Sequence, residues 1–352
     1  MAAGCVIGAR PPCWSTGNSS NMGFCIACFL RGHPRRSGPA FGPMSKYVRP
    51  EIIGLVLGSF LLALFRKEFG AKGGSPPLTR FVLGMFVMIG CLMFLGCPFR
   101  MILRLAGGDW NALFGLAGFV CGILVGVFFL NRGYSLHRSY RLPRTEGILF
   151  PALMAALLVL LVGAPALLRF TESGGGPGAQ HAAVALSLAA GLVVVLWPSI
   201  PVFAWWARIR DIILFRESKL LLGFVGVFAS ALVCNLILTA VTAGTYFNPG
   251  FTGQAVAHTD GVWNFLGMLL AGYGCVLLGG GCPLRQLVLS GEGNTDSAMT
   301  VLGLMAGAAF AHNFGLASSG EGPTANGKIA VIIGLAVVSA IACLEPFGKK
   351  RK

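Results

Sequence analysis

Long apolar stretches recur along most of the chain, and they constrain its fold more than any other feature. Of the 352 residues, 55% are hydrophobic and only 11% are charged. A soluble domain carries about 25% charged residues, and a helix needs about 20 mostly apolar residues to cross a bilayer. The sequence therefore predicts an all-α integral membrane protein.

The apolar stretches fall into two length classes. The longer ones predict nine spans, roughly at residues 51–65, 80–95, 112–130, 148–168, 182–199, 219–240, 262–280, 298–316 and 328–344. The shorter ones are residues 23–31, 97–106, 203–214 and 282–290. A piece of about ten residues cannot cross the bilayer, so it must dip into the membrane or lie among other helices. We expect about nine transmembrane helices plus four short membrane-embedded helices.

The basic residues are distributed unevenly between the predicted loops. The formal net charge of +15 would suit a nucleic-acid partner, but most Lys and Arg residues flank apolar spans, which is typical of membrane orientation. If the basic tail 346–352 is cytoplasmic, the outer loops after residue 50 hold only Arg100, Arg104, Arg169 and Lys328. The distribution predicts a cytoplasmic C-terminus and no nucleic-acid partner.

One short motif occurs twice. Gly96-Cys97-Pro98-Phe99-Arg100 returns 185 residues later as Gly281-Cys282-Pro283-Leu284-Arg285. Proline is favoured at the first position of a helix, so each motif predicts a short helix with its cysteine at the N-cap. The alternative is two coincidental buried cysteines beside helix-starting prolines.

Glycines after the motif repeat at the same offset. Gly118 and Gly122 recur as Gly303 and Gly307, and glycines spaced by four residues predict close helix packing.

The two copies of the motif are separated by five predicted spans. An odd number places the copies in opposite orientations, so we expect two inverted pseudo-repeats, which is a transporter design. The predicted divisions are an irregular N-terminal segment with a short Cys-containing helix (1–50), a first repeat (51–145), connecting transmembrane helices (146–200), a second repeat (201–345) and a basic cytoplasmic tail (346–352).

The motif residues point to an anionic substrate. A helix N-terminus carries unsatisfied N–H groups and the positive end of the helix dipole, and both attract anions. Arg100 and Arg285 stand one helical turn after Cys97 and Cys282, so each arginine can add positive charge there. The alternative is that each arginine reaches to the lipid headgroups, and Glu292 and Asp296 could neutralise Arg285.

Other kinds of chemistry find little support. Cys25-x2-Cys28 could form a redox pair or part of a metal site, but a second such pair is absent and the five histidines are scattered. Walker A, Rossmann and Ser-His-Asp patterns are absent as well. We expect no metal, no cofactor and no enzymatic activity.

Several longer motifs resemble the YeeE/YedE membrane family, and in particular its YedE-related branch associated with selenium metabolism. They are Asn21-Met22-Gly23-Phe24-Cys25-Ile26-Ala27-Cys28-Phe29, Arg49-Pro50-Glu51-Ile52-Ile53-Gly54, Gly96-Cys97-Pro98-Phe99-Arg100-Met101-Ile102-Leu103-Arg104-Leu105, Ile209-Arg210-Asp211-Ile212-Ile213-Leu214-Phe215-Arg216 and Gly281-Cys282-Pro283-Leu284-Arg285 with Gly291-Glu292-Gly293-Asn294-Thr295-Asp296. The resemblance implies a transporter in the bacterial inner membrane that takes up a small sulfur- or selenium-containing anion, such as thiosulfate.

The resemblance also assigns residues to a substrate path. Cys97 and Cys282 match the motif cysteines, Cys25 is the expected third, and Cys28 and Asn294 are secondary candidates. Two alternatives remain open. One is a membrane thiol redox protein that uses Cys25 and Cys28, and the other is a subunit that delivers sulfur or selenium to a soluble partner.

Overall fold

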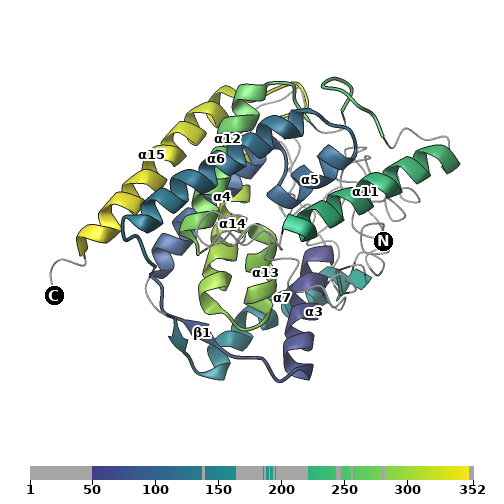
Figure 1. Ribbon diagram of the computed structural model, residues 1–352. Coiled ribbons are helices and arrows are strands. Elements are labelled where there is room, and N and C mark those ends of the chain that lie inside the picture. Colours follow the sequence, from purple (N-terminus) through teal and green to yellow (C-terminus); the bar gives the residue numbers. More distant parts are fainter. Residues whose placement is uncertain are drawn as a thin grey trace.

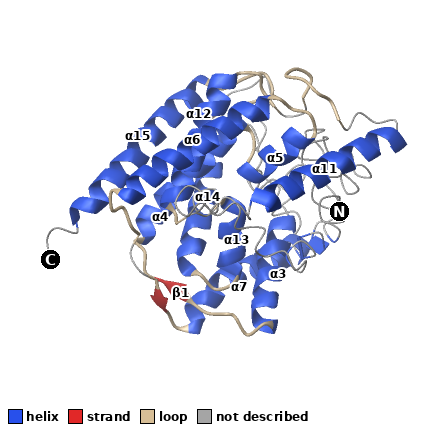
Figure 2. Ribbon diagram, viewed as in Figure 1, coloured by secondary structure: helices blue, strands red, loops and turns tan. Residues whose placement is uncertain are grey.

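The structure is a computed structural model, and it is mostly helical (Figure 2). It describes residues 50–136, 139–163, 185, 188–189, 191–192, 195, 221–242, 247–254, 257–279 and 282–348. The predictions for Cys25, Cys28, the short pieces 23–31 and 203–214, the tail after residue 348 and most of the span 182–199 lie outside these residues.

Helices form the body of the described chain, and one short pair of strands lies at its edge (Figure 1). The helices are α3 (Pro50–Phe65), α4 (Pro77–Phe94), α5 (Pro98–Ala106), α6 (Asn111–Asn131), α7 (Arg144–Gly163), α11 (Leu221–Thr242), α12 (Gly261–Leu277), α13 (Pro283–Gly291), α14 (Thr295–Asn313) and α15 (Ala325–Gly348). The strands β1 (Lys72–Gly73) and β2 (Tyr140–Arg141) pair antiparallel.

Among the residues that the structure describes, four helices are long and apolar enough to cross a membrane. They are residues Pro77–Ala106 (α4 with its continuation α5), Asn111–Asn131, Arg144–Gly163 and Ala325–Leu344. In Pro77–Ala106, 78% of an 18-residue apolar stretch is buried inside the protein, whereas in α7 the buried share of such a stretch is only 28%. Large apolar side chains such as Leu149 and Val159 are exposed on α7, as is Ile329 on α15. An exposed apolar surface of this extent fits a lipid environment.

The core is built from α4, α6, α12 and α14. Here α6 packs along α12 and α14 packs along α4, while α4 and α12 cross each other. A Cβ atom added at Gly118 would collide with the carbonyl oxygen of Phe265, and one added at Gly303 would collide with that of Phe81. Gly122 and Gly307 approach α12 and α4 in the same way. The predicted role of these glycines in close helix packing is confirmed.

The two short helices α5 and α13 begin as the repeated motif predicts. Each has nine residues, a proline in its first turn and a cysteine at its N-cap, Cys97 or Cys282. Each is followed by a glycine at positive φ, Gly108 at 91° and Gly293 at 99°. Side chains rarely adopt this conformation, so the glycine lets the chain turn directly into the next long helix.

Contacts between the two halves of the chain hold these turns in place. The Asn111 Nδ2 atom, at the start of α6, donates to the carbonyl oxygen of Phe251 over 2.7 Å. The Asp296 carboxylate, at the start of α14, accepts hydrogen bonds from the backbone N–H groups of Gly74 and Ser75. Each half thus holds a loop of the other half, which ties together two regions far apart in the sequence.

Candidate functional site

The two motif cysteines are buried where the short helices begin. Cys97 is 1% exposed and Cys282 is 3% exposed. Both have an extended backbone, with ψ at 166° and 160°, as an N-cap requires. The N–H groups of the first helical turn therefore lie next to each thiol, and a helix N-terminus favours negative charge at that position. The sequence predicted this arrangement at both positions.

A third buried thiol, Cys275 of α12, accompanies these two. Its side chain is 3% exposed, and its thiol lies within electrostatic range of both Cys97 and Cys282. The sequence analysis did not single out Cys275, because its proximity depends on how α12 lies against the two short helices. The signal in the sequence was that Cys275 lies about two helical turns before Cys282.

The two motif arginines occupy different environments. Arg100 is 1% exposed, and its Cδ atom would lie 3.2 Å from a Cβ atom added at Gly96. The glycine therefore makes room for the arginine stem. Arg285 is partly exposed, and its charge acts on both the Cys282 thiol and the Glu292 carboxyl group. Arg285 thus acts on the thiol of its own motif and has contact with solvent, whereas Arg100 is buried.

Arg104 is fully buried and forms an ion pair that sequence reasoning missed. Its Nε atom lies 2.7 Å from Oδ2 of Asp109, and both side chains are 0% exposed. Its Nη1 atom donates to the carbonyl oxygen of Phe94 over 2.8 Å, and its guanidinium lies 4.2 Å from the centre of the Phe94 ring. Both Arg100 and Arg104 lie in α5, within the short helix predicted at residues 97–106, and their side chains are buried. The available signal was an aspartate five residues after Arg104, across a Gly-Gly turn.

His258 lies near the same end of α4. Its Nε2 atom is 2.9 Å from the carbonyl oxygen of Met93, and the side chain is 1% exposed. Burial lowers the pKa of His258 below its usual value, and the hydrogen bond to Met93 opposes this shift. The ring is therefore neutral at pH 7.

Asn294 has a structural role in this arrangement. It is the N-cap of α14, and its Oδ1 atom accepts a hydrogen bond from the N–H of Ser297 over 3.0 Å. The Asp296 carboxylate contacts Gly74, Ser75 and Arg80. The contacts of the Asp296 carboxylate therefore come from the start of α4 and the loop before it.

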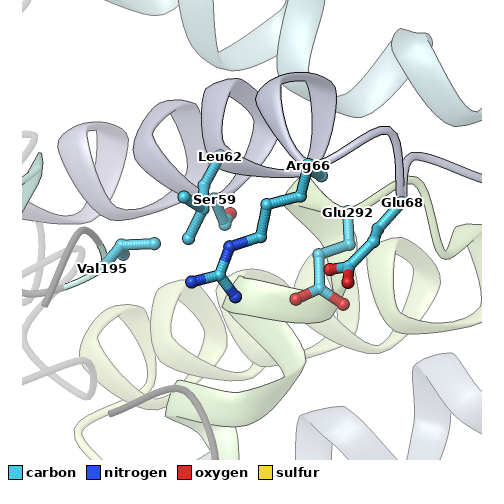
Figure 3. A pocket seen from close by; sticks show the side chains of 7 residues that line it. Ser59, Leu62, Arg66, Glu68, Val195 and Glu292 are labelled. Carbon is cyan, nitrogen blue, oxygen red and sulfur yellow. The ribbon is translucent and has the colours of Figure 1, made fainter. Parts of the chain in front are cut away.

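A small pocket opens beside the end of α13, with an empty volume of about 330 Å³. It is lined by Ser59, Leu62, Ala63, Arg66, Glu68, Val195 and Glu292. Figure 3 shows the side chain of Arg66 crossing the pocket, with its guanidinium directed away from the carboxyl groups of Glu68 and Glu292. No sequence pattern indicates this pocket, because its walls come from three segments that are far apart in the sequence.

Glu292 is a half-buried acid of this pocket. Burial raises the pKa of the Glu292 carboxyl above its usual value, and the neighbouring Glu68 carboxylate raises it further. The positive charges of Arg285 and Lys72 act in the opposite direction. An electrostatic interaction of Glu292 with Arg285 was one of the possibilities raised by the sequence, whereas the proximity of Glu68 was not.

Metal binding has no basis in the geometry of the described residues. Among the residues for which the structure gives positions, no three His, Cys, Asp or Glu side chains gather closely enough to hold an ion. The thiol, arginine and carboxyl groups described above are instead suited to binding an anion and a proton.

Comparison with known families gives one match. A family model described as "Sulphur transport" matches residues 202–344, which include α11 to α14 and most of α15. This match supports the resemblance noted from the motifs. It covers Cys282, Arg285 and Glu292, but not the first copy of the motif. No curated protein matches the chain. A sulfur-related membrane transporter is therefore the function class that the match and the apolar helices support.

Proposed function

We propose that this protein takes up a small sulfur- or selenium-containing anion, such as thiosulfate, across the bacterial inner membrane. The observation that carries the proposal is the matched pair of buried thiols, Cys97 and Cys282, each at the N-cap of a short helix. The sulphur-transport match over residues 202–344 supports the same conclusion. The proposed arrangement has about nine spans in two inverted repeats, with a cytoplasmic C-terminus.

In this proposal the anion passes along a path of thiols, with Cys25 as the third. A thiol is a weak hydrogen-bond donor, and the N–H groups of a helix N-terminus add partial positive charge. Such groups attract an anion without holding it tightly, and a transporter must also release what it binds. The Cys275 thiol extends the same surface between the two short helices.

The arginines have distinct roles in this proposal. Arg100 is buried beside Cys97 in α5, so it stabilises negative charge deep within the protein. Arg285 is partly exposed and lies within electrostatic range of Cys282, so it attracts anions at the mouth of the path. A charge buried in a membrane is costly, and it usually marks a functional pathway or a binding partner.

The proposal is tested by uptake of labelled thiosulfate into cells that lack other uptake routes, with selenite and selenosulfate as competitors. Cys97→Ser and Cys282→Ser are compared with wild type. Cys121→Ser is the matched control, because Cys121 is a partly exposed residue of α6. We expect uptake to be lost in both motif variants and kept in the control, and the competitors to rank sulfur against selenium.

Two outcomes would contradict the proposal. Unchanged uptake in both motif variants would reduce the cysteines to parts of the helix architecture. No uptake by well-expressed wild type would favour the alternatives, which a further variant separates. A redox protein requires Cys28, whereas a delivery subunit requires a soluble partner for any transfer.

A further inference from the structure

The pocket at the end of α13 brings together acidic and basic side chains that the anion path does not use. Glu292 comes from the C-cap of α13, and Glu68 and Arg66 come from the segment after α3. Lys72 of β1 lies outside the pocket lining but acts electrostatically on Glu292. The pocket is close to the surface, because Arg66 and Glu68 are exposed. Solvent protons therefore reach the carboxyl groups directly.

The backbone fixes these side chains relative to one another. The N–H of Gly70 donates to the carbonyl oxygen of Glu292 over 3.5 Å, and the N–H of Lys72 donates to that of Gly293 over 3.4 Å. The Thr295 hydroxyl donates to the carbonyl oxygen of Lys72 over 3.0 Å. The segment that carries Glu68 and Lys72 is thus attached to the turn that carries Glu292, and the proximity of the charges is built into the fold.

We infer that Glu292, together with Glu68, is a proton-binding site that couples proton uptake to the binding of the sulfur-containing anion at the Arg285 end of the path. The inference rests on the proposed function. Arg285 connects the two events, since its charge acts on the Cys282 thiol at one end of α13 and on the Glu292 carboxyl group at the other.

The direction of the coupling follows from the charges. Arg285 and Lys72 favour the ionised form of Glu292, whereas burial and Glu68 favour its protonated form. An anion bound near Arg285 offsets the positive charge that keeps Glu292 ionised, so a proton binds more readily. By reciprocity, protonation of Glu292 removes a negative charge from the mouth and strengthens anion binding by the same factor.

The other charged groups on the elements packed against α13 either contact residues other than Glu292 or are exposed. Asp296 of α14 accepts hydrogen bonds from Gly74 and Ser75 and pairs with Arg80. Helix α7 contacts the turn through Gly147, which lies beside the carbonyl oxygen of Gly293, while Arg144 and Glu146 at its start are exposed. On α3, the pocket wall consists of Ser59, Leu62 and Ala63. The groups that act on Glu292 are therefore Glu68, Arg285 and Lys72, with Arg66 across the pocket.

The test is isothermal titration of thiosulfate into the purified full-length protein, in buffers of different ionisation enthalpy, from mildly acidic to neutral pH. For wild type we expect net proton uptake on binding, and an affinity that rises as the pH falls. The expected rise is on the order of fivefold, at the low end for coupled binding, because the pocket is open to solvent. Glu292→Gln should bind thiosulfate without proton uptake and with an affinity that does not depend on pH.

Two further variants make the result specific. Glu68→Gln removes a like charge and so lowers the pKa of Glu292, which should move proton uptake to a lower pH. Glu146→Gln removes an exposed acid on α7 and should behave as wild type. Thiosulfate binding without proton uptake in wild type would overturn the coupling and leave the proposed function standing. The absence of binding at every pH would overturn both.

Discussion

Helices α5 and α13 begin and end with similar backbone conformations, but the charged side chains around them differ. Both helices begin with a buried N-cap cysteine and a proline, and both lead into a glycine at positive φ. At the end of α5, Arg104 and Asp109 form an ion pair with no exposed surface. At the same offset the second half has Leu289 and Asn294, and its charges lie in a pocket that opens beside α13.

The backbone features are required by the architecture and occur in both halves, whereas the charged side chains distinguish the two sides. A helix start after a cysteine and a sharp turn depend on the backbone, so Pro and Gly appear in both halves. The charged side chains are free to differ, and they leave the Cys97 side closed by a buried ion pair and the Cys282 side accessible to solvent. In the proposed transporter, the two ends of the path therefore differ in their electrostatics.

The largest expected effect comes from breaking the buried ion pair. Arg104→Met leaves the Asp109 carboxylate buried without its cation, and such a loss costs about 3–5 kcal/mol. We expect a large drop in the thermal unfolding temperature of the detergent-purified protein. Arg285→Met is the matched variant of the other half, and it should cost much less because Arg285 is partly exposed.

A double variant checks this explanation. Arg104→Met with Asp109→Leu removes both charges and should recover part of the stability, because the buried carboxylate is gone. Equal losses in Arg104→Met and Arg285→Met would contradict the contrast between a closed side and an open side.

A smaller and symmetric effect is expected at the helix crossings. Gly118→Ala and Gly303→Ala each force a methyl group against a backbone carbonyl, of Phe265 and Phe81 respectively. Overpacking of this kind costs about 1–3 kcal/mol, so the two variants should lower the unfolding temperature by similar amounts. Gly226→Ala in α11 is the control, since no other heavy atom of the described residues lies within 4 Å of its added methyl. Unequal losses would show that the two halves do not share this packing.

The elements that could be predicted from the sequence are those whose requirements are local. Pro98 and Pro283 indicate helix starts, and Gly118 and Gly303 indicate close helix packing. Each residue type imposes its own constraint on the backbone or on how closely a neighbouring helix can approach. The predicted helix ranges also lie close to α3, α6 and α12. Helix α14 begins three residues before its predicted start, because its polar first turn, capped by Asn294, has no apolar signal.

The parts that could not be predicted depend on distant segments. The pocket forms only when the segment of Glu68 and Lys72 meets the turn of Glu292, and no local pattern links the two. The Arg104–Asp109 ion pair was not predicted either, since it forms across the turn at Gly107 and Gly108. Cys275 belongs with the path thiols only through the packing of α12. The sequence alone therefore does not indicate which charged side chains come together in the fold.

The smallest expected effect is a difference in the pH dependence of stability between the two sides. Burial lowers the pKa of His258, near the Cys97 side. The stability from its neutral ring is present above the unfolded pKa and is lost as the pH falls from there through the folded pKa. Burial raises the pKa of Glu292 on the other side, so its contribution is full below the unfolded pKa and is lost as the pH rises through the folded pKa.

Variants should separate these two pH dependences of stability when the unfolding temperature is measured across pH. His258→Gln keeps a hydrogen-bond donor for Met93 and should remove the acid-side loss, whereas Glu292→Gln should remove the loss on the neutral side. Glu146→Gln, at an exposed acid of α7, should leave both slopes in place. If Glu292→Gln flattened the acid side instead, the carboxyl group would be ionised in the folded protein throughout the range, and the electrostatic contrast between the two mouths would not include a titrating group near Cys282.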